Sequence, residues 1–121
     1  MSVLLRACLI VVLFAGHFGC SSISQTGYYW GKYSETLYPL VSDQSNANLR
    51  KHADELQRII TESEHRSLKV PPGVHADLGY TFQRLNEPDE AKQQYLKEME
   101  TYPESRTFIE RLIARGTNAE Q

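Results

Sequence analysis

The residues that could do chemistry in this 121-residue chain are its four histidines, its two cysteines and its carboxylates. His52, His65 and His75 lie beyond the apolar N-terminus, and no two of them have the i, i+4 spacing that places two metal ligands on one helix face. The acidic stretch 62–65 could hold a divalent ion weakly, but it is better explained as a charged, exposed helix end. No serine, cysteine or carboxylate pair is framed by glycine-rich turns or a strand-to-helix elbow. We therefore expect a protein that is not an enzyme and binds no metal or cofactor.

The composition limits the remaining classes of function. Thirteen Lys and Arg residues stand against 15 Asp and Glu residues, without the clustered basic face that a nucleic-acid partner would need. The length allows one small domain. Once the apolar N-terminus is set aside, the rest is rich in Glu, Lys and Arg with few β-branched runs, which is typical of an all-α protein.

The N-terminus resembles a bacterial lipoprotein signal peptide over residues 1–19. Arg6 precedes an apolar run from Ala7 to Ala15, which is too short to span a bilayer and has the length of a signal-peptide core. Gly19-Cys20 then matches the end of a lipobox. His17 and Phe18 depart from the Leu and small residue that are usual there. The competing interpretation is ordinary secretion, with cleavage after Ser22.

Cys20 has an evident use if the lipobox is processed. Cys8 would leave with the signal peptide, so the mature chain would have a single thiol and could form no internal disulfide. Acyl chains such as palmitate, each contributing about 0.8 kcal/mol per buried methylene, would anchor the protein firmly. Ser21, rather than Asp, follows the cysteine, so we expect the protein to be lipid-anchored in the outer membrane and to face the periplasm.

We assign residues 20–32 to a tether and an aromatic entry segment that precede the helical domain. The most aromatic stretch, 28–38, begins in this segment and continues into the domain. It contains the only Trp and four of the seven Tyr residues. Ser34 could cap a short helix that runs through Leu40. The aromatic side chains could form a partner surface or a bilayer-interface belt. Alternatively, Trp30 and Tyr33 could cover the open end of the helical core. We favour this second interpretation.

The longest predicted helix runs from Ser45 to about Ser67, with Ser45 or Asn46 as its N-cap. Its apolar positions recur at helical spacing and form one buried stripe: Leu49, Ala53, Leu56, Ile59 and Ile60. Its charged positions predict a solvated opposite face: Arg50, Lys51, Glu55, Arg58 and Glu62. The helix ends before the turn at 70–73, whose two prolines and glycine direct the chain into the next helix.

Residues 74–103 resemble a tetratricopeptide (TPR) helical hairpin. The TPR pattern is W-x2-L-G-x2-Y, A-x3-F and a closing P, within a period of about 34 residues. The chain agrees in residue type at all of these places except the Trp, where His75 stands, with Phe82 and Tyr95 as the two aromatic residues: Leu78, Gly79, Phe82, Ala91, Tyr95 and Pro103. The small residues would let the two helices approach closely, and the larger ones would fill the space around the crossing. The alternative is a generic helical hairpin with accidental matches.

A final helix is predicted to about Arg115. Phe108, Ile109, Leu112 and Ile113 give it an apolar face, Gly116 ends it, and 117–121 form a frayed tail. Shifting the TPR pattern back by 34 residues finds no second match. We therefore predict a TPR-like domain at 33–116 with about five helices in a short right-handed α-solenoid: one degenerate hairpin, one good hairpin and a cap.

The first helix of a TPR hairpin presents its outward positions to partners. Here these positions are Asp77, Tyr80, Thr81, Gln83 and Arg84. Tyr80 and Arg84 lie one turn apart, and Tyr and Arg are frequent interface hot spots. We expect Tyr80 and Arg84, with Asp77, to bind a protein partner. A merely solvated face is the alternative.

Three blocks together carry a wider resemblance: YYWGKYSETLY at 28–38, LKVPPGVHADLGY at 68–80 and YPES at 102–105. They resemble a family of small bacterial lipoproteins that carry a domain of unknown function with TPR-like helices. Members are typically encoded beside a lipoprotein similar to the curli secretion channel subunit. The resemblance implies an adaptor in an outer-membrane surface-assembly or secretion complex. A related TPR lipoprotein activates a peptidoglycan synthase, so activation of a penicillin-binding protein is the alternative function.

Overall fold

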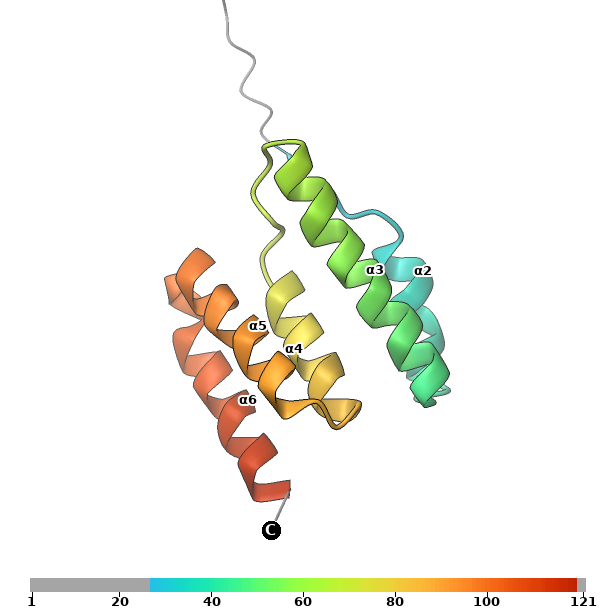
Figure 1. The fold of residues 1–121 in the computed structure, drawn as a ribbon, viewed down its shortest axis with the longest axis vertical. Coiled ribbons are helices and arrows are strands. Elements are labelled where there is room, and N and C mark those ends of the chain that lie inside the picture. The colour runs from blue at the N-terminus through green and yellow to red at the C-terminus, as the bar shows by residue number, and fades with distance from the viewer. Residues whose placement is uncertain (1–26, 120–121) are drawn as a thin grey trace, which may run out of the picture.

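The computed structural model describes residues 27–119, which form five α-helices and two short 3-10 helices. The first helix pair is α2 (Tyr33–Leu37), continued by η1 (Tyr38–Val41), and α3 (Asn46–His65). The second pair is α4 (Val74–Arg84) and α5 (Pro88–Thr101). After η2 (Pro103–Ser105), α6 (Arg106–Ala119) closes the chain. Successive helices run up and down beside one another (Figure 1). The predicted all-α fold of five helices is confirmed. The lipoprotein signal and Cys20 lie outside the described residues.

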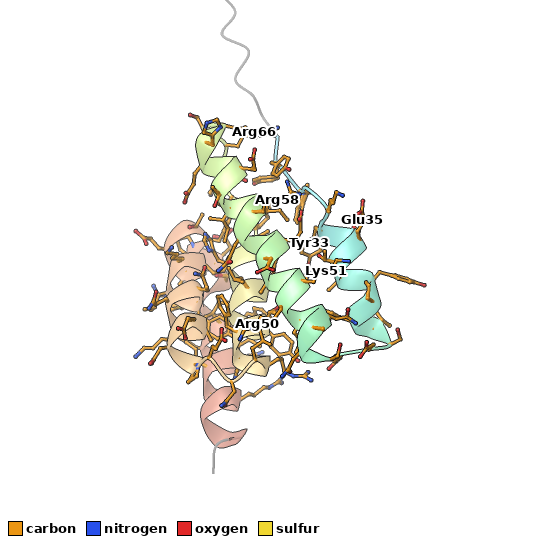
Figure 2. All side chains as sticks on the ribbon, turned by 45° about the vertical axis from the view of Figure 1, so that its right-hand side comes forward. Tyr33, Glu35, Arg50, Lys51, Arg58 and Arg66 are labelled. Carbon is orange, nitrogen blue, oxygen red and sulfur yellow. The ribbon has the colours of Figure 1, made fainter. Side chains whose placement is uncertain are left out.

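The long helix α3 begins as the sequence predicts. Ser45 is its N-cap, and the Ser45 side chain accepts a hydrogen bond from the Asn48 backbone N–H. The predicted apolar stripe is buried, and Leu56 and Ile59 are completely inaccessible to solvent. Arg50, Lys51 and Arg58 are spaced along the other face of this helix, and Arg66 lies at its C-cap (Figure 2).

Glu55 is a correction to the predicted solvated face of α3, because it is only 8% exposed. Its carboxylate accepts hydrogen bonds from the Lys32 backbone N–H and from the Arg58 guanidinium. Burial alone would raise the pKa of Glu55, but these hydrogen bonds and the neighbouring positive charges outweigh burial and hold that pKa below its usual value. Glu55 therefore fixes the segment before α2 onto α3.

The aromatic segment packs partly as predicted. Tyr33 lies against the core, and its ring contacts His52 at a centroid distance of 5.6 Å. Trp30 contacts the Tyr33 ring at 5.5 Å but stays 43% exposed, and Tyr28 is 47% exposed. Lys32, not Ser34, is the N-cap of α2, and no side chain caps this helix. The expected Ser34 cap is therefore wrong.

The hairpin α4–α5 confirms the packing expected of the TPR-like residues. Leu78, Phe82, Ala91 and Tyr95 are all buried. A Cβ placed on Gly79 would lie 2.7 Å from the Tyr95 ring and 3.0 Å from the Ala91 carbonyl oxygen, so only glycine fits this helix crossing. Pro88 is the first residue of α5, and α5 ends at Thr101, before Pro103 opens η2.

The last helix differs from the prediction at two places. Ile109 is fully buried, but Phe108 is 57% exposed and does not join the core. Gly116 does not end α6, which continues to Ala119. Gly116 instead gives room to the Gln83 side chain of α4, which lies where a Cβ would stand. A close interhelix contact, and not a helix end, explains this glycine.

Candidate functional site

Two open hollows flank the exposed side of α4. The first hollow, of about 220 Å³, lies between α4 and the α2–η1 segment. The second, of about 440 Å³, lies between α4 and α6. Asp77 and Tyr80 line both hollows, so together the hollows form one continuous surface, which we call the α4 groove. This groove is the candidate site for a partner.

The predicted anchors lie in the α4 groove. Tyr80 is 44% exposed although it is a large aromatic residue. The Arg84 guanidinium donates a weak hydrogen bond to the Tyr80 hydroxyl, with an Nη1–O distance of 3.4 Å. The structure therefore brings Tyr80 and Arg84 together on an accessible surface, as the one-turn spacing predicted.

Apolar residues that the sequence did not assign to a site line the walls of the groove. Val41 of η1 is 80% exposed in the first hollow, and Phe108 of α6 lines the second. Exposed Val and Phe side chains on opposite sides of an exposed Tyr form an apolar surface of the kind that marks interaction sites. Val41 has no signal in the sequence, because it follows a proline in a non-periodic segment. The spacing of Phe108 beside Ile109 predicts a core position instead of a groove wall.

Asp77 was expected to meet a partner, but its carboxylate points into the protein. Its Oδ2 atom accepts a hydrogen bond from the Tyr33 hydroxyl at 2.9 Å and lies 3.0 Å from Nε2 of His52. His52 is fully buried. Burial is the main cause that raises the pKa of the Tyr33 hydroxyl well above its usual value, and the negative charge of Asp77 and the hydrogen bond to it raise that pKa further. Asp77 therefore ties α4 to both α2 and α3.

The neighbours of His52 determine the hydrogen on its Nε2 atom. Its Nδ1 atom lies 2.8 Å from the Thr36 hydroxyl, which also lies 3.1 Å from the Tyr33 carbonyl oxygen. If that hydroxyl donates to the histidine, the ring is neutral and carries its hydrogen on Nε2. If it donates to the carbonyl, both ring nitrogens carry hydrogens. In either case Nε2–H donates to Asp77, because a bare ring nitrogen would repel a carboxylate.

Glu98 holds α4 from the other side. Gly73, the N-cap of α4, has no side chain to satisfy the first N–H groups of that helix. The buried Glu98 carboxylate of α5 takes its place, accepting from Gly73 N–H at 2.8 Å and from Ala76 N–H at 3.3 Å. This cap has no local signal in the sequence, because its partners are 25 and 22 residues away.

Two other positions expected to face outward lie elsewhere. Thr81 is only 2% exposed, and its hydroxyl donates to the Asp77 carbonyl oxygen at 2.8 Å. Gln83 is half-buried and accepts from the Tyr95 hydroxyl at 2.9 Å. The helix has a wider buried face than the pattern suggested, because α3, α5 and α6 all contact it.

His52 and His75 are both buried, and each lies within hydrogen-bond distance of a side chain of the domain. His75, at the Trp place of the TPR pattern, is buried, and its Nδ1 lies 2.8 Å from Oε1 of Gln94. Residues 27–119 contain no cluster of three or more His, Cys, Asp or Glu side chains placed to hold a metal ion. No helix in the same range is long and apolar enough to cross a bilayer.

The fold and the α4 groove define a small helical-hairpin protein with an accessible surface along the first helix of its central hairpin. A model of the family "Domain of unknown function (DUF4810)" matches residues 28–112. Because this match covers well over half of the 121 residues, the chain belongs to the DUF4810 family. The match begins at Tyr28 and thus includes the aromatic segment that packs on α3. No curated protein and no solved structure gives a significant match.

Proposed function

We propose that this protein is a non-catalytic, protein-binding adaptor of the bacterial envelope. In this proposal Cys20 carries the lipid anchor, the domain faces the periplasm from the outer membrane, and the α4 groove binds a polypeptide of a surface-assembly or secretion complex. The observation that supports binding is the groove itself, in which Val41, Tyr80 and Phe108 remain exposed around α4.

The geometry favours a polypeptide over a small molecule. The first hollow, at about 220 Å³, is smaller than the roughly 300–1,000 Å³ of small-molecule pockets, and the second, at about 440 Å³, lies at the low end of that range. Both hollows open to solvent on either side of Tyr80. A polypeptide can place separate side chains into separate hollows, as interface anchors do. The resemblance to lipoproteins encoded beside a curli-channel-like lipoprotein supports the envelope setting.

The test is a photo-crosslink in cells that express the full chain. A photoreactive benzoyl-phenylalanine replaces Tyr80 in one strain and Leu96 in a control strain. Leu96 is 51% exposed but lies on α5, outside the α4 groove. We expect a defined protein adduct at position 80 and none at position 96. Equal adducts at both positions, or no adduct at 80, would refute the groove as the binding site.

The identity of the crosslinked partner decides between the two envelope functions. A channel-type lipoprotein in the adduct supports the adaptor. A penicillin-binding protein would instead indicate activation of a peptidoglycan synthase. Mass spectrometry of the mature N-terminus tests the anchor separately: we expect an acylated Cys20, whereas an unmodified Ile23 would show ordinary secretion.

A further inference from the structure

The charged residues that line the α4 groove differ in whether they are already paired within the protein. Three charged residues line its hollows: Asp77, Arg84 and Arg115. Asp77 accepts hydrogen bonds from Tyr33 and His52, so its charge is largely satisfied from within. Arg84 and Arg115 are exposed, and neither forms an ion pair with a carboxylate of residues 27–119. The groove therefore offers positive charge to a partner.

The two arginines lie at the same end of the groove. Arg84 is the last residue of α4, and Arg115 lies in the last turns of α6. Their sequence neighbours are in contact, because the Gln83 side chain occupies the space beside Gly116. The C-terminal ends of α4 and α6 point the same way (Figure 1). Two guanidiniums are thus available at one end, where they could bind carboxylates.

Most of the remaining lining is apolar, with Gln44 and Thr81 as polar residues in the first hollow. Leu37, Leu40 and Val41 line the first hollow, while Phe108 and Leu112 line the second. We infer that the α4 groove binds an acidic segment of the partner polypeptide, with an apolar side chain in each hollow and carboxylates at Arg84 and Arg115. The inference rests on the proposed function and adds the chemistry of the partner to it.

The same crosslink at position 80 tests this inference in two charge backgrounds. Arg84→Gln with Arg115→Gln removes both groove cations. The matched control, Arg106→Gln with Arg111→Gln, removes two exposed arginines of α6 that line neither hollow. Because exposed ion pairs contribute about 0.2–1 kcal/mol each, we expect the groove variant to lose roughly two- to thirty-fold in adduct yield. The control should retain its yield. Circular dichroism checks that both variants fold.

Mapping of the adduct supplies a second readout. We expect the crosslinked segment of the partner to contain more Asp and Glu than Lys and Arg, with apolar residues between them. If the groove variant and the control variant gave the same yield of the position-80 adduct, whether unchanged or equally reduced, the acidic-segment inference would be overturned. An adduct on a basic segment would overturn it as well, while the groove would stay the binding site. Absence of any adduct at position 80 would overturn the proposed function and this inference with it.

Discussion

Replacement of Glu98 should lower the free energy of unfolding although it removes little apolar surface. The Glu98→Ala variant removes a buried carboxylate that accepts from the N–H groups of Gly73 and Ala76 at the start of α4. The Val74 N–H is already bonded to the Pro71 carbonyl oxygen. No side chain of the Pro71–Gly73 turn can replace the lost acceptor. The start of α4 would therefore keep two N–H groups without a protein partner, of which the Ala76 N–H is buried.

The size of the effect follows from these two hydrogen bonds. A hydrogen bond to a charged group contributes about 1.5–3 kcal/mol, and loss of a helix cap costs about 0.5–2 kcal/mol. Because the Ala76 bond is long at 3.3 Å, we expect Glu98→Ala to lower the free energy of unfolding by about 2–4 kcal/mol. For a domain of this length that is a fall in Tm of roughly 10–30 °C. Glu98→Gln keeps one acceptor oxygen and should lose about half as much.

The assay is urea and thermal unfolding followed by circular dichroism. Glu100→Ala is the matched control, because Glu100 lies on the same helix but is exposed. Its replacement should change the free energy of unfolding by no more than about 0.5 kcal/mol. If Glu98→Ala were as mild as Glu100→Ala, the carboxylate would not be the cap of α4, and the account of how α4 is positioned would be wrong.

Three further predictions concern the other contacts of the hairpin. Gly79→Ala should lower the free energy of unfolding by about 1–3 kcal/mol, because the added Cβ would lie 2.7 Å from the Tyr95 ring. Gly27→Ala is the control and should be neutral in the same unfolding assay, because no atom lies within 4 Å of its Cβ. Asp77→Asn should lower the free energy of unfolding by about 1–3 kcal/mol and reduce the position-80 adduct, since it weakens the hydrogen bonds that join α4 to α2 and α3. The control Asp54→Asn, at an exposed position, should change neither quantity. Burial raises the pKa of Tyr95 to about 12. The unfolded chain ionises this group near pH 10, so the free energy of unfolding should fall as the pH rises from about 10 to 12. Tyr95→Phe should show a shallower fall in a pH series, and an identical slope would contradict the assignment.

The contacts that the sequence predicted are those with a local, periodic signal. Leu78, Gly79 and Phe82 repeat at helical spacing, and Ala91 and Tyr95 repeat in the next helix, so their shared crossing is recognisable in the sequence alone. Ser45 is recognisable as a cap because its partner lies three residues away. Such features depend on neighbours along the chain, and a linear pattern contains them.

The contacts that a linear pattern misses join residues distant in sequence. Glu98 and Glu55 each occupy a helix position where a carboxylate normally faces water, and only the fold places backbone N–H groups beside them. The Asp77 carboxylate meets a tyrosine 44 residues away. Phe108 differs for another reason: of these two adjacent apolar residues of α6 only Ile109 is buried, whereas the adjacent Ile59 and Ile60 of α3 are both buried. Periodicity alone does not say which of two neighbours is buried.

The residues that hold α4 in place differ from the exposed residues that we expect to contact the partner. Asp77 and Glu98 fasten α4 to its neighbours on two sides, and through these contacts they set the shape of both hollows. Tyr80, Arg84 and Arg115 are exposed and take no part in those contacts. Replacement of these three should therefore change the free energy of unfolding by less than about 0.5 kcal/mol each while it reduces partner capture. If all three variants unfolded as easily as Glu98→Ala, the groove residues would be structural, and a loss of adduct in them would say nothing about binding.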